Sequence, residues 1–145
     1  MEGQEILNIL QRDRAVGPTL RGVCSIDEPW PEPVMVPASY VINTDTKTGP
    51  GEHWVAFYIS ADGHCDYFES LGTAPIRPIW KWLKKRTKSV IFNKQWLQSP
   101  VSEVCGHYCI YFLRARARGR SLGDILTDFQ EYDFEQNDNK VRNKL

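Results

Sequence analysis

The chain has 145 residues, a formal net charge of +0 at pH 7, and 41% apolar and 12% aromatic residues. This composition indicates a folded protein with a core of its own, and the balanced charge gives no general attraction for nucleic acid. No apolar run approaches the roughly 18 residues of a membrane span, and the first ten residues lack the pattern of a secretory signal, so neither is expected. The four cysteines are too few for a disulfide scaffold and favour a reducing, intracellular setting.

The amino-terminal third predicts one helix and then a loop with short strands. Apolar residues recur at helical spacing in the first twelve residues, which predicts a helix over 2–12. Glycines and prolines interrupt the pattern afterwards, so 16–33 is expected to be a long loop with at most a short strand near 20–25. Another short strand is predicted at 38–45, followed by a turn at 47–52.

The middle of the chain carries the clearest sheet signal. Aromatic and β-branched residues fill 53–60 and 64–70, and the Ala-Asp-Gly stretch between these segments predicts a hairpin. A helix with a proline near its start is expected over 74–88, and a further strand over 89–98.

The last third predicts helices. The first covers 103–118 and is closed by Gly119, a shorter one lies within 121–130, and the polar segment 131–145 is expected to be a flexible tail. Short strands joined by a hairpin and flanked by helices predict a single α+β domain over 1–145. Its sheet is expected to be mostly antiparallel and packed by helices.

The start of the helix predicted at 103–118 carries a candidate nucleophile. Cys105 stands in its first turn, with Gly106 directly behind it. A helix start lowers the pKa of a thiol, because its unpaired N–H groups and its dipole stabilise the thiolate, the attacking form. The alternative is that Cys105 is a small buried hydrophobe, as free cysteines often are.

A thiol nucleophile needs a base and a group that orients the base. His107 is two residues from Cys105, and residues at that spacing on a helix do not face each other, while His64 lies at the hairpin tip. His53 opens the strongest strand and is the best-placed histidine. If the hairpin strands pair, His53 and Glu69 lie close together at its open end as base and orienting acid. The alternative for Glu69 is a solvated carboxylate at a strand end.

Three stretches around these positions resemble the signature blocks of the adenovirus-type cysteine proteases (adenains), which are related to the ubiquitin-like-protein-specific proteases. The stretches are GEHWVAFYIS, DYFESLG and LQSPVSEVCGHYCIYFL, in that order. GPTLRGVCS and YVINTDTKTG are similar to the family's amino-terminal segment, so the resemblance covers roughly 5–115. It implies a papain-like, adenain-type fold with the nucleophile at the start of a central helix.

Carried over residue by residue, the resemblance implies a catalytic set. His53 would be the base, Glu69 its orienting residue and Cys105 the nucleophile. Gln98 would donate its side-chain N–H to the oxyanion, and Trp54 would help to wall the substrate cleft. The acid position carries glutamate here, whereas many relatives of the ubiquitin-like group carry aspartate. Glutamate favours the viral branch of the family, which includes adenovirus-like DNA transposons.

The implied function is a cysteine endopeptidase without a metal or other cofactor, which cleaves Gly-containing sites in viral or virus-like precursor proteins. The alternative is an isopeptidase that removes ubiquitin-like proteins from their targets. Adenoviral members extend well beyond the cysteine helix and are stimulated by a short viral peptide and by DNA. This chain ends at Leu145, so we expect some surfaces for substrate or for an activating peptide to be missing. A viral enzyme would work in the host nucleus or the virion.

Two other functions compete with the protease, a zinc site and a DNA-binding module. A zinc site could use Cys105, His107 and Cys109, but the stretch has no Cys-x-x-Cys pair and no second cluster at finger spacing, so no metal is expected. A DNA-binding module is suggested by basic residues beside two tryptophans. These are Lys81, Lys84, Lys85, Arg86 and Lys88, followed later by Arg114, Arg116, Arg118 and Arg120. Such charge is usually a solvated helix face. The alternative is that it supplies sequence-independent phosphate contacts, with DNA as an accessory partner beside protein substrates.

Overall fold

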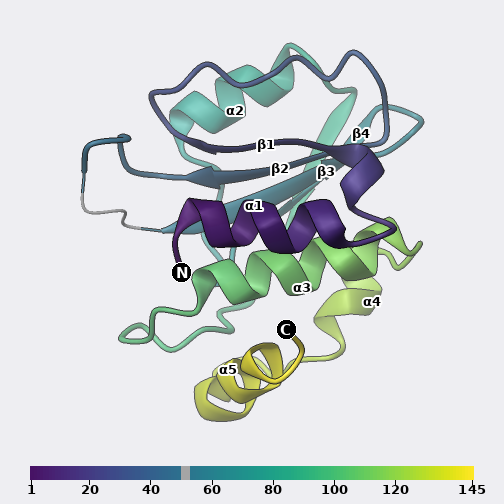
Figure 1. Ribbon diagram of the computed structural model, residues 1–145. Helices are drawn as coiled ribbons and strands as arrows, with labels where there is room; N and C mark the ends of the chain where they lie inside the picture. The colour runs from purple at the N-terminus through teal and green to yellow at the C-terminus, as the bar shows by residue number, and fades with distance from the viewer. Residues whose placement is uncertain (50–52) are drawn as a thin grey trace.

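The computed structural model describes residues 1–49 and 53–145, so the turn predicted at 47–52 lies partly outside the described residues. The elements, shown in Figure 1, are α1 (Gly3–Arg12), the 3₁₀ helix η1 (Gly17–Thr19), β1 (Leu20–Ser25), β2 (Ala38–Asn43), β3 (Trp54–Ile59), β4 (His64–Phe68), α2 (Arg77–Lys84), β5 (Ser89–Phe92), α3 (Cys105–Ala117), α4 (Leu122–Leu126) and α5 (Phe134–Arg142).

The strands form one sheet in the order β1-β2-β3-β4-β5. The pairs β2/β3 and β3/β4 are antiparallel, whereas β1/β2 and β4/β5 are parallel. The predicted α+β class is confirmed, and the antiparallel character holds for the centre of the sheet, with parallel pairs at both edges. The edges differ because two long connections, 26–37 and 69–88, carry the chain back before the next strand starts.

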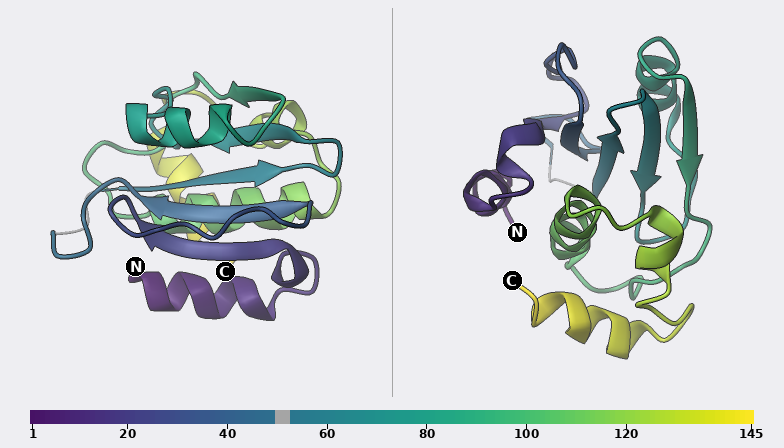
Figure 2. Two further views of the ribbon diagram at one scale, coloured as in Figure 1. Left: turned by 90° about the horizontal axis from the view of Figure 1, so that it is seen from above. Right: turned by 90° about the vertical axis from the view of Figure 1, so that its right-hand side faces the viewer.

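Helices cover both faces of this sheet. α1 and α3 pack side by side on one face, and α2 lies on the other (Figures 1 and 2). Ile6 of α1, Val41 of β2 and Phe112 of α3 share one apolar core, while Phe57 of β3 and Leu83 of α2 belong to a second core. Alternate residues of a strand point to opposite faces, so the central strands are apolar almost throughout.

Two predicted elements are shorter in the structure for identifiable reasons. The helix predicted over 74–88 is α2, which has Pro78 in its first turn, where a missing N–H costs no hydrogen bond. The strand predicted over 89–98 ends at Phe92, because the side chain of Asn93 turns back to bond the backbone of Glu69.

The segment 131–145 was predicted to be a flexible tail, and this prediction is wrong for most of it. The segment contains α5, which buries Val141 in the core that Ile6 and Phe112 share and is also held by polar contacts. The hydroxyl of Tyr108 on α3 donates to Asp138 Oδ1 at 2.7 Å, and Asn137 Nδ2 donates to the carbonyl of Leu97 at 3.1 Å. A polar sequence predicts a solvated segment, because the sequence does not reveal such buried hydrogen-bond partners.

Candidate active site

The predicted base and acid meet at one end of the sheet. His53 directly precedes β3, and Glu69 directly follows β4. The register of β3 and β4 pairs Ala56 with Phe68, so the next step places Glu69 opposite Val55. Glu69 and His53 are therefore diagonal neighbours, a separation that long side chains can bridge.

The carboxylate of Glu69 holds the imidazole of His53. His53 Nε2 is hydrogen-bonded to Glu69 Oε1, and the Glu69 side chain is only 1% exposed. Glu69 Oε1 also accepts the N–H of Leu71 at 3.1 Å, and Oε2 accepts the N–H and hydroxyl of Thr73 at 2.9 and 2.6 Å. Burial raises the pKa of Glu69, but the hydrogen bonds and charge of His53 and the bonds from Thr73 outweigh burial and lower it.

Asn93 is a site residue that sequence reasoning missed. Its Oδ1 accepts the backbone N–H of Glu69 at 2.9 Å, and its Nδ2 donates to the Glu69 carbonyl at 2.7 Å. Asn93 is buried, so these two bonds clamp the peptide that carries the orienting acid. An asparagine after a strand has no motif of its own, and only a structure could connect it with Glu69.

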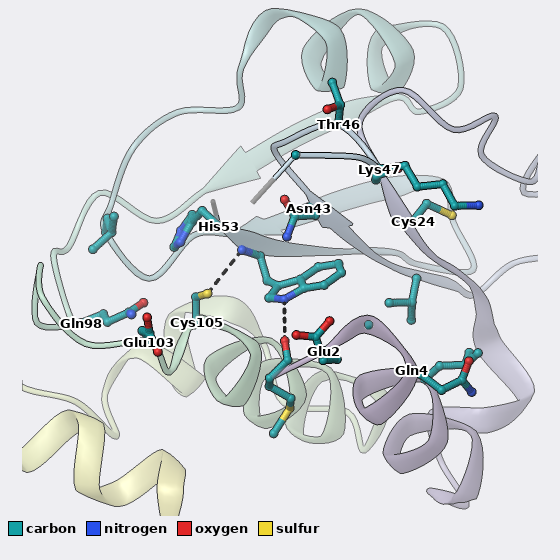
Figure 3. A pocket seen from close by; sticks show the side chains of 18 of the residues that line it. Glu2, Gln4, Cys24, Asn43, Thr46, Lys47, His53, Gln98, Glu103 and Cys105 are labelled. Carbon is teal, nitrogen blue, oxygen red and sulfur yellow. Dashed lines mark hydrogen bonds between the residues drawn. The ribbon is translucent and has the colours of Figure 1, made fainter. Parts of the chain in front are cut away.

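Cys105 opens α3 and faces the base (Figure 3). The N–H of Trp54 donates to Cys105 Sγ at 3.4 Å, and the His53 ring also bonds the thiol. Burial raises the pKa of Cys105, but the bonds from His53 and from the Trp54 N–H, together with the His53 charge, outweigh burial and lower it. The structure therefore brings the three predicted residues together.

The pKa of His53 moves in the opposite sense. Burial favours the neutral ring, but hydrogen bonds and charges from Cys105 and Glu69 outweigh this and raise the pKa of His53 to about 9. The remaining thiols behave as buried hydrophobes, because burial raises the pKa of Cys24, Cys65 and Cys109. At neutral pH the arrangement favours a thiolate at Cys105 and an imidazolium at His53.

Gln98 lies beside Cys105 and lines the same cleft (Figure 3). Its side chain is buried. The Ser70 hydroxyl donates to Gln98 Oε1 at 2.5 Å, and Gln98 Nε2 donates to the Ser102 carbonyl at 3.0 Å. The position suits a donor to an oxyanion, and that role remains a prediction.

A cleft of about 830 Å³ extends from the catalytic residues to the start of α1 and the ends of β1 and β2. Trp54 lines it, as predicted for a wall of the substrate site, and its indole N–H donates to the Met1 carbonyl at 3.1 Å. Trp54 therefore bonds Cys105 through its backbone N–H and the first residue of the chain through its indole. Substrate contact by Trp54 remains a prediction.

The basic residues considered for DNA contact lie outside this cleft. α2 is on the face of the sheet opposite α3 (Figure 1), and there Arg86 bonds Glu32 at 2.6 Å and stacks over Trp82 at 4.2 Å. The later basic run is largely neutralised by aspartates. Arg114 and Arg118 pair with Asp13, Arg116 with Asp66, and Arg120 with Asp124 and Asp128.

Residues 1–49 and 53–145 contain neither a cluster of metal ligands nor a membrane-spanning helix. In these ranges, no three His, Cys, Asp or Glu side chains are placed to hold one metal ion. The zinc alternative needed Cys109 as a ligand, and Cys109 is packed in the core instead. No helix in the same ranges is long and apolar enough to cross a membrane.

Comparison with known proteins also points to cysteine proteases. No protein-family model matches the chain. Cysteine protease S273R of African swine fever virus is 30% identical over 110 residues, which are 65% of this chain and 40% of that protein. A protein from another isolate of this virus, named SUMO-1 cysteine protease S273R, matches to the same extent. The chain thus spans about 40% of the length of these relatives.

Solved structures agree in fold. A crystal structure of the African swine fever virus pS273R protease matches with a TM-score of 0.54 at 26% identity, over 72% of this chain and 42% of that chain. A second crystal structure of the protease gives a TM-score of 0.56 at 24% identity, over 72% and 41%. Neither comparison supports DNA binding, an activating peptide or an adenoviral origin. In sequence and fold, the greater part of this chain is thus similar to the cysteine protease S273R of African swine fever virus.

Proposed function

We propose that this chain is a cysteine protease that hydrolyses the bond after the carboxyl-terminal tail of a ubiquitin-like protein. The observation that carries the proposal is the hydrogen-bonded series of Cys105, His53 and Glu69 beside an open cleft. Its charges favour a thiolate next to an imidazolium, the pair that nucleophilic thiol catalysis needs.

The reaction follows from this geometry. The thiolate of Cys105 attacks the scissile carbonyl carbon, a C–S bond forms, and negative charge moves to the carbonyl oxygen. His53 then gives its proton to the leaving amine as the C–N bond breaks, which leaves a thioester and a neutral imidazole. Water attacks the thioester while His53 takes one of its protons. The C–S bond breaks, the acid product leaves, and the thiolate–imidazolium pair is restored.

We assign two N–H groups to the stabilisation of the oxyanion. The backbone N–H of Cys105 lies at a helix start, where N–H groups have no partner within the helix. Gln98 Nε2 is the second donor that we assign. A fixed pair of donors stabilises the charge that develops only in the transition state, so their effect falls on kcat rather than on KM.

The substrate class is supported by the relative that is named SUMO-1 cysteine protease S273R. Processing of viral precursor proteins at Gly-containing sites is a second candidate, which the viral source of these relatives and the signature blocks favour. The four cysteines, all within the described residues, are free, which suits work in a reducing compartment such as a host cell.

Two probes test the proposal: a fluorogenic peptide that ends in Gly-Gly, and SUMO-1 with a short carboxyl-terminal extension. We expect wild-type protein to cleave them and Cys105→Ala and His53→Ala to lose nearly all turnover. Cys65→Ala and His64→Ala are the matched controls, because Cys65 lies in the second core and His64 is exposed at the hairpin. Full turnover by Cys105→Ala would contradict a thiol mechanism. Cleavage of a Gly-x-Gly precursor peptide alone would favour the second candidate.

A further inference from the structure

We propose that Ser70 is a positioning residue of the active site, which fixes the side-chain amide of Gln98 so that its N–H₂ group, rather than its oxygen, serves the oxyanion. The proposal rests on the function proposed above, because it assigns a support to the oxyanion donor. Ser70 directly follows Glu69, so adjacent residues would hold the orienting acid and the oxyanion donor.

The hydrogen bonds determine which end of the Gln98 amide is the nitrogen. The Ser102 carbonyl oxygen can only accept, so the atom 3.0 Å from it must be Nε2. The other end is then Oε1, an acceptor, and the Ser70 hydroxyl 2.5 Å away must donate to it. Reversing the amide would place two acceptors against each other at Ser102.

One N–H of Gln98 is available for an oxyanion. Nε2 donates to the Ser102 carbonyl and lies 3.3 Å from the Ser102 hydroxyl oxygen. The hydroxyl contact is the longer of the two, and this hydroxyl has another partner, the carbonyl of Ser99 at 3.2 Å. A charged oxygen in the cleft would replace the hydroxyl as acceptor, because a charge-assisted bond is stronger than a neutral one.

The backbone of Ser70 also bonds the loop that carries Gln98. Its carbonyl accepts the N–H groups of Leu97 and Gln98 at 2.9 and 3.0 Å. Ser70 is 1% exposed and Gln98 is 2% exposed, so water cannot readily replace the hydroxyl. Removing the hydroxyl would leave Gln98 Oε1 buried without this donor, and the amide would reorient to recover a partner. The backbone bonds would stay and keep the loop in place.

The test is a double-mutant cycle of Ser70→Ala and Gln98→Ala, measured with the Gly-Gly peptide. We expect Ser70→Ala to lower kcat by about 10- to 100-fold with little change in KM, less than the roughly 100- to 1,000-fold expected for complete loss of an oxyanion donor. In the Gln98→Ala background, Ser70→Ala should lower kcat no further. Independent, multiplying effects would overturn the proposal.

Ser39→Ala is the matched control. Ser39 is a strand serine, 0% exposed, whose hydroxyl bonds that of Thr19 away from the cleft. It removes an equally buried hydroxyl bond and should leave kcat near the wild-type value. A fall in kcat equal to that of Ser70→Ala would mean that any buried serine of the fold has this effect, and would overturn a specific role.

A measurement without turnover separates this proposal from the proposed function. The side-chain N–H₂ signals of Gln98, identified by their loss in Gln98→Ala, report the order of the amide in nitrogen-labelled protein. We expect the order parameter to fall in Ser70→Ala and to stay unchanged in Ser39→Ala. Unchanged order in Ser70→Ala would overturn the positioning role. Failure of the wild-type protein to cleave either probe would instead count against the proposed function.

Discussion

Burial alone would keep Cys105 and His53 neutral, yet the hydrogen bonds that join them to each other and to Glu69 reverse both preferences. The Glu69 carboxylate is almost completely buried and accepts hydrogen bonds from Thr73 and Leu71. Its negative charge therefore stays next to the imidazole. At the scale of single residues, the preference for a thiolate beside an imidazolium is therefore an electrostatic property of the group, and no member would have it alone.

The pH dependence of cleavage follows from these shifts. His53 loses its proton as pH rises through its raised pKa of about 9, and the leaving amine then lacks a proton donor, so kcat/KM should fall there. The pKa of Cys105 is lowered, so its thiolate persists to lower pH and the acid limb should lie below that of an ordinary thiol. Steady-state kinetics from pH 5 to 10 check both limbs. An alkaline limb near the ordinary histidine value of about 6.5 would contradict the assignment.

At the scale of elements, the loop that carries Gln98 depends on helices that come later in the chain. The carbonyl of Leu97 accepts the Tyr108 hydroxyl of α3 at 3.3 Å and Asn137 Nδ2 of α5 at 3.1 Å. Leu97 precedes Gln98, so α5 supports the active site although it contributes no residue to the cleft. Asn137 also accepts the backbone N–H of Gln130 and donates to its carbonyl. These bonds fix the segment that leads into α5.

Asn137→Ala tests this support. It removes the acceptor of the Gln130 N–H and one of the two donors to each of the Gln130 and Leu97 carbonyls. We therefore expect the free energy of unfolding to fall by about 1–3 kcal/mol and kcat to fall as the Gln98 loop loosens. Urea unfolding and steady-state kinetics measure the two effects. Asn139→Ala, at an exposed position of the same helix, is the control and should change neither. Equal losses in the two variants would show that the hydrogen bonds of Asn137 give the Gln98 loop no specific support.

At the scale of the whole molecule, two apolar cores on opposite faces of the sheet bury every cysteine but one. Cys65 belongs to the core under α2 and Cys109 to the core under α3, whereas Cys105 is partly exposed at the cleft. Cys24 is 9% exposed, and burial raises its pKa. The fold thus gives one thiol both solvent access and thiolate character.

Alkylation with iodoacetamide checks this distribution. Native protein at neutral pH should gain one adduct, at Cys105, because the other thiols are covered and protonated. Denatured protein should gain four, one for each cysteine. Intact mass and peptide mapping read out the number and position of the adducts. Modification of Cys24 or Cys65 at the rate of Cys105 would contradict the structure.

Local patterns in the sequence determined the part of the site that depends on near neighbours. The 53–60 and 64–70 segments could be recognised as a hairpin, and a hairpin brings His53 to Glu69 whatever the rest of the chain does. The helix start at Cys105 was equally local. The role of Gln98 came from the family resemblance, since a glutamine in a turn has no pattern of its own.

Only the tertiary structure decided the features that join distant segments. The parallel edges of the sheet, the packing of α5, the Asn93 clamp on Glu69 and the Ser70–Gln98 bond each connect residues far apart in the chain. Periodicity reports whether a side chain is apolar, and so it identifies elements that are buried through apolar surface. A buried serine or asparagine resembles a solvated one in sequence, because its burial is made favourable by hydrogen-bond partners that only the folded chain brings within reach.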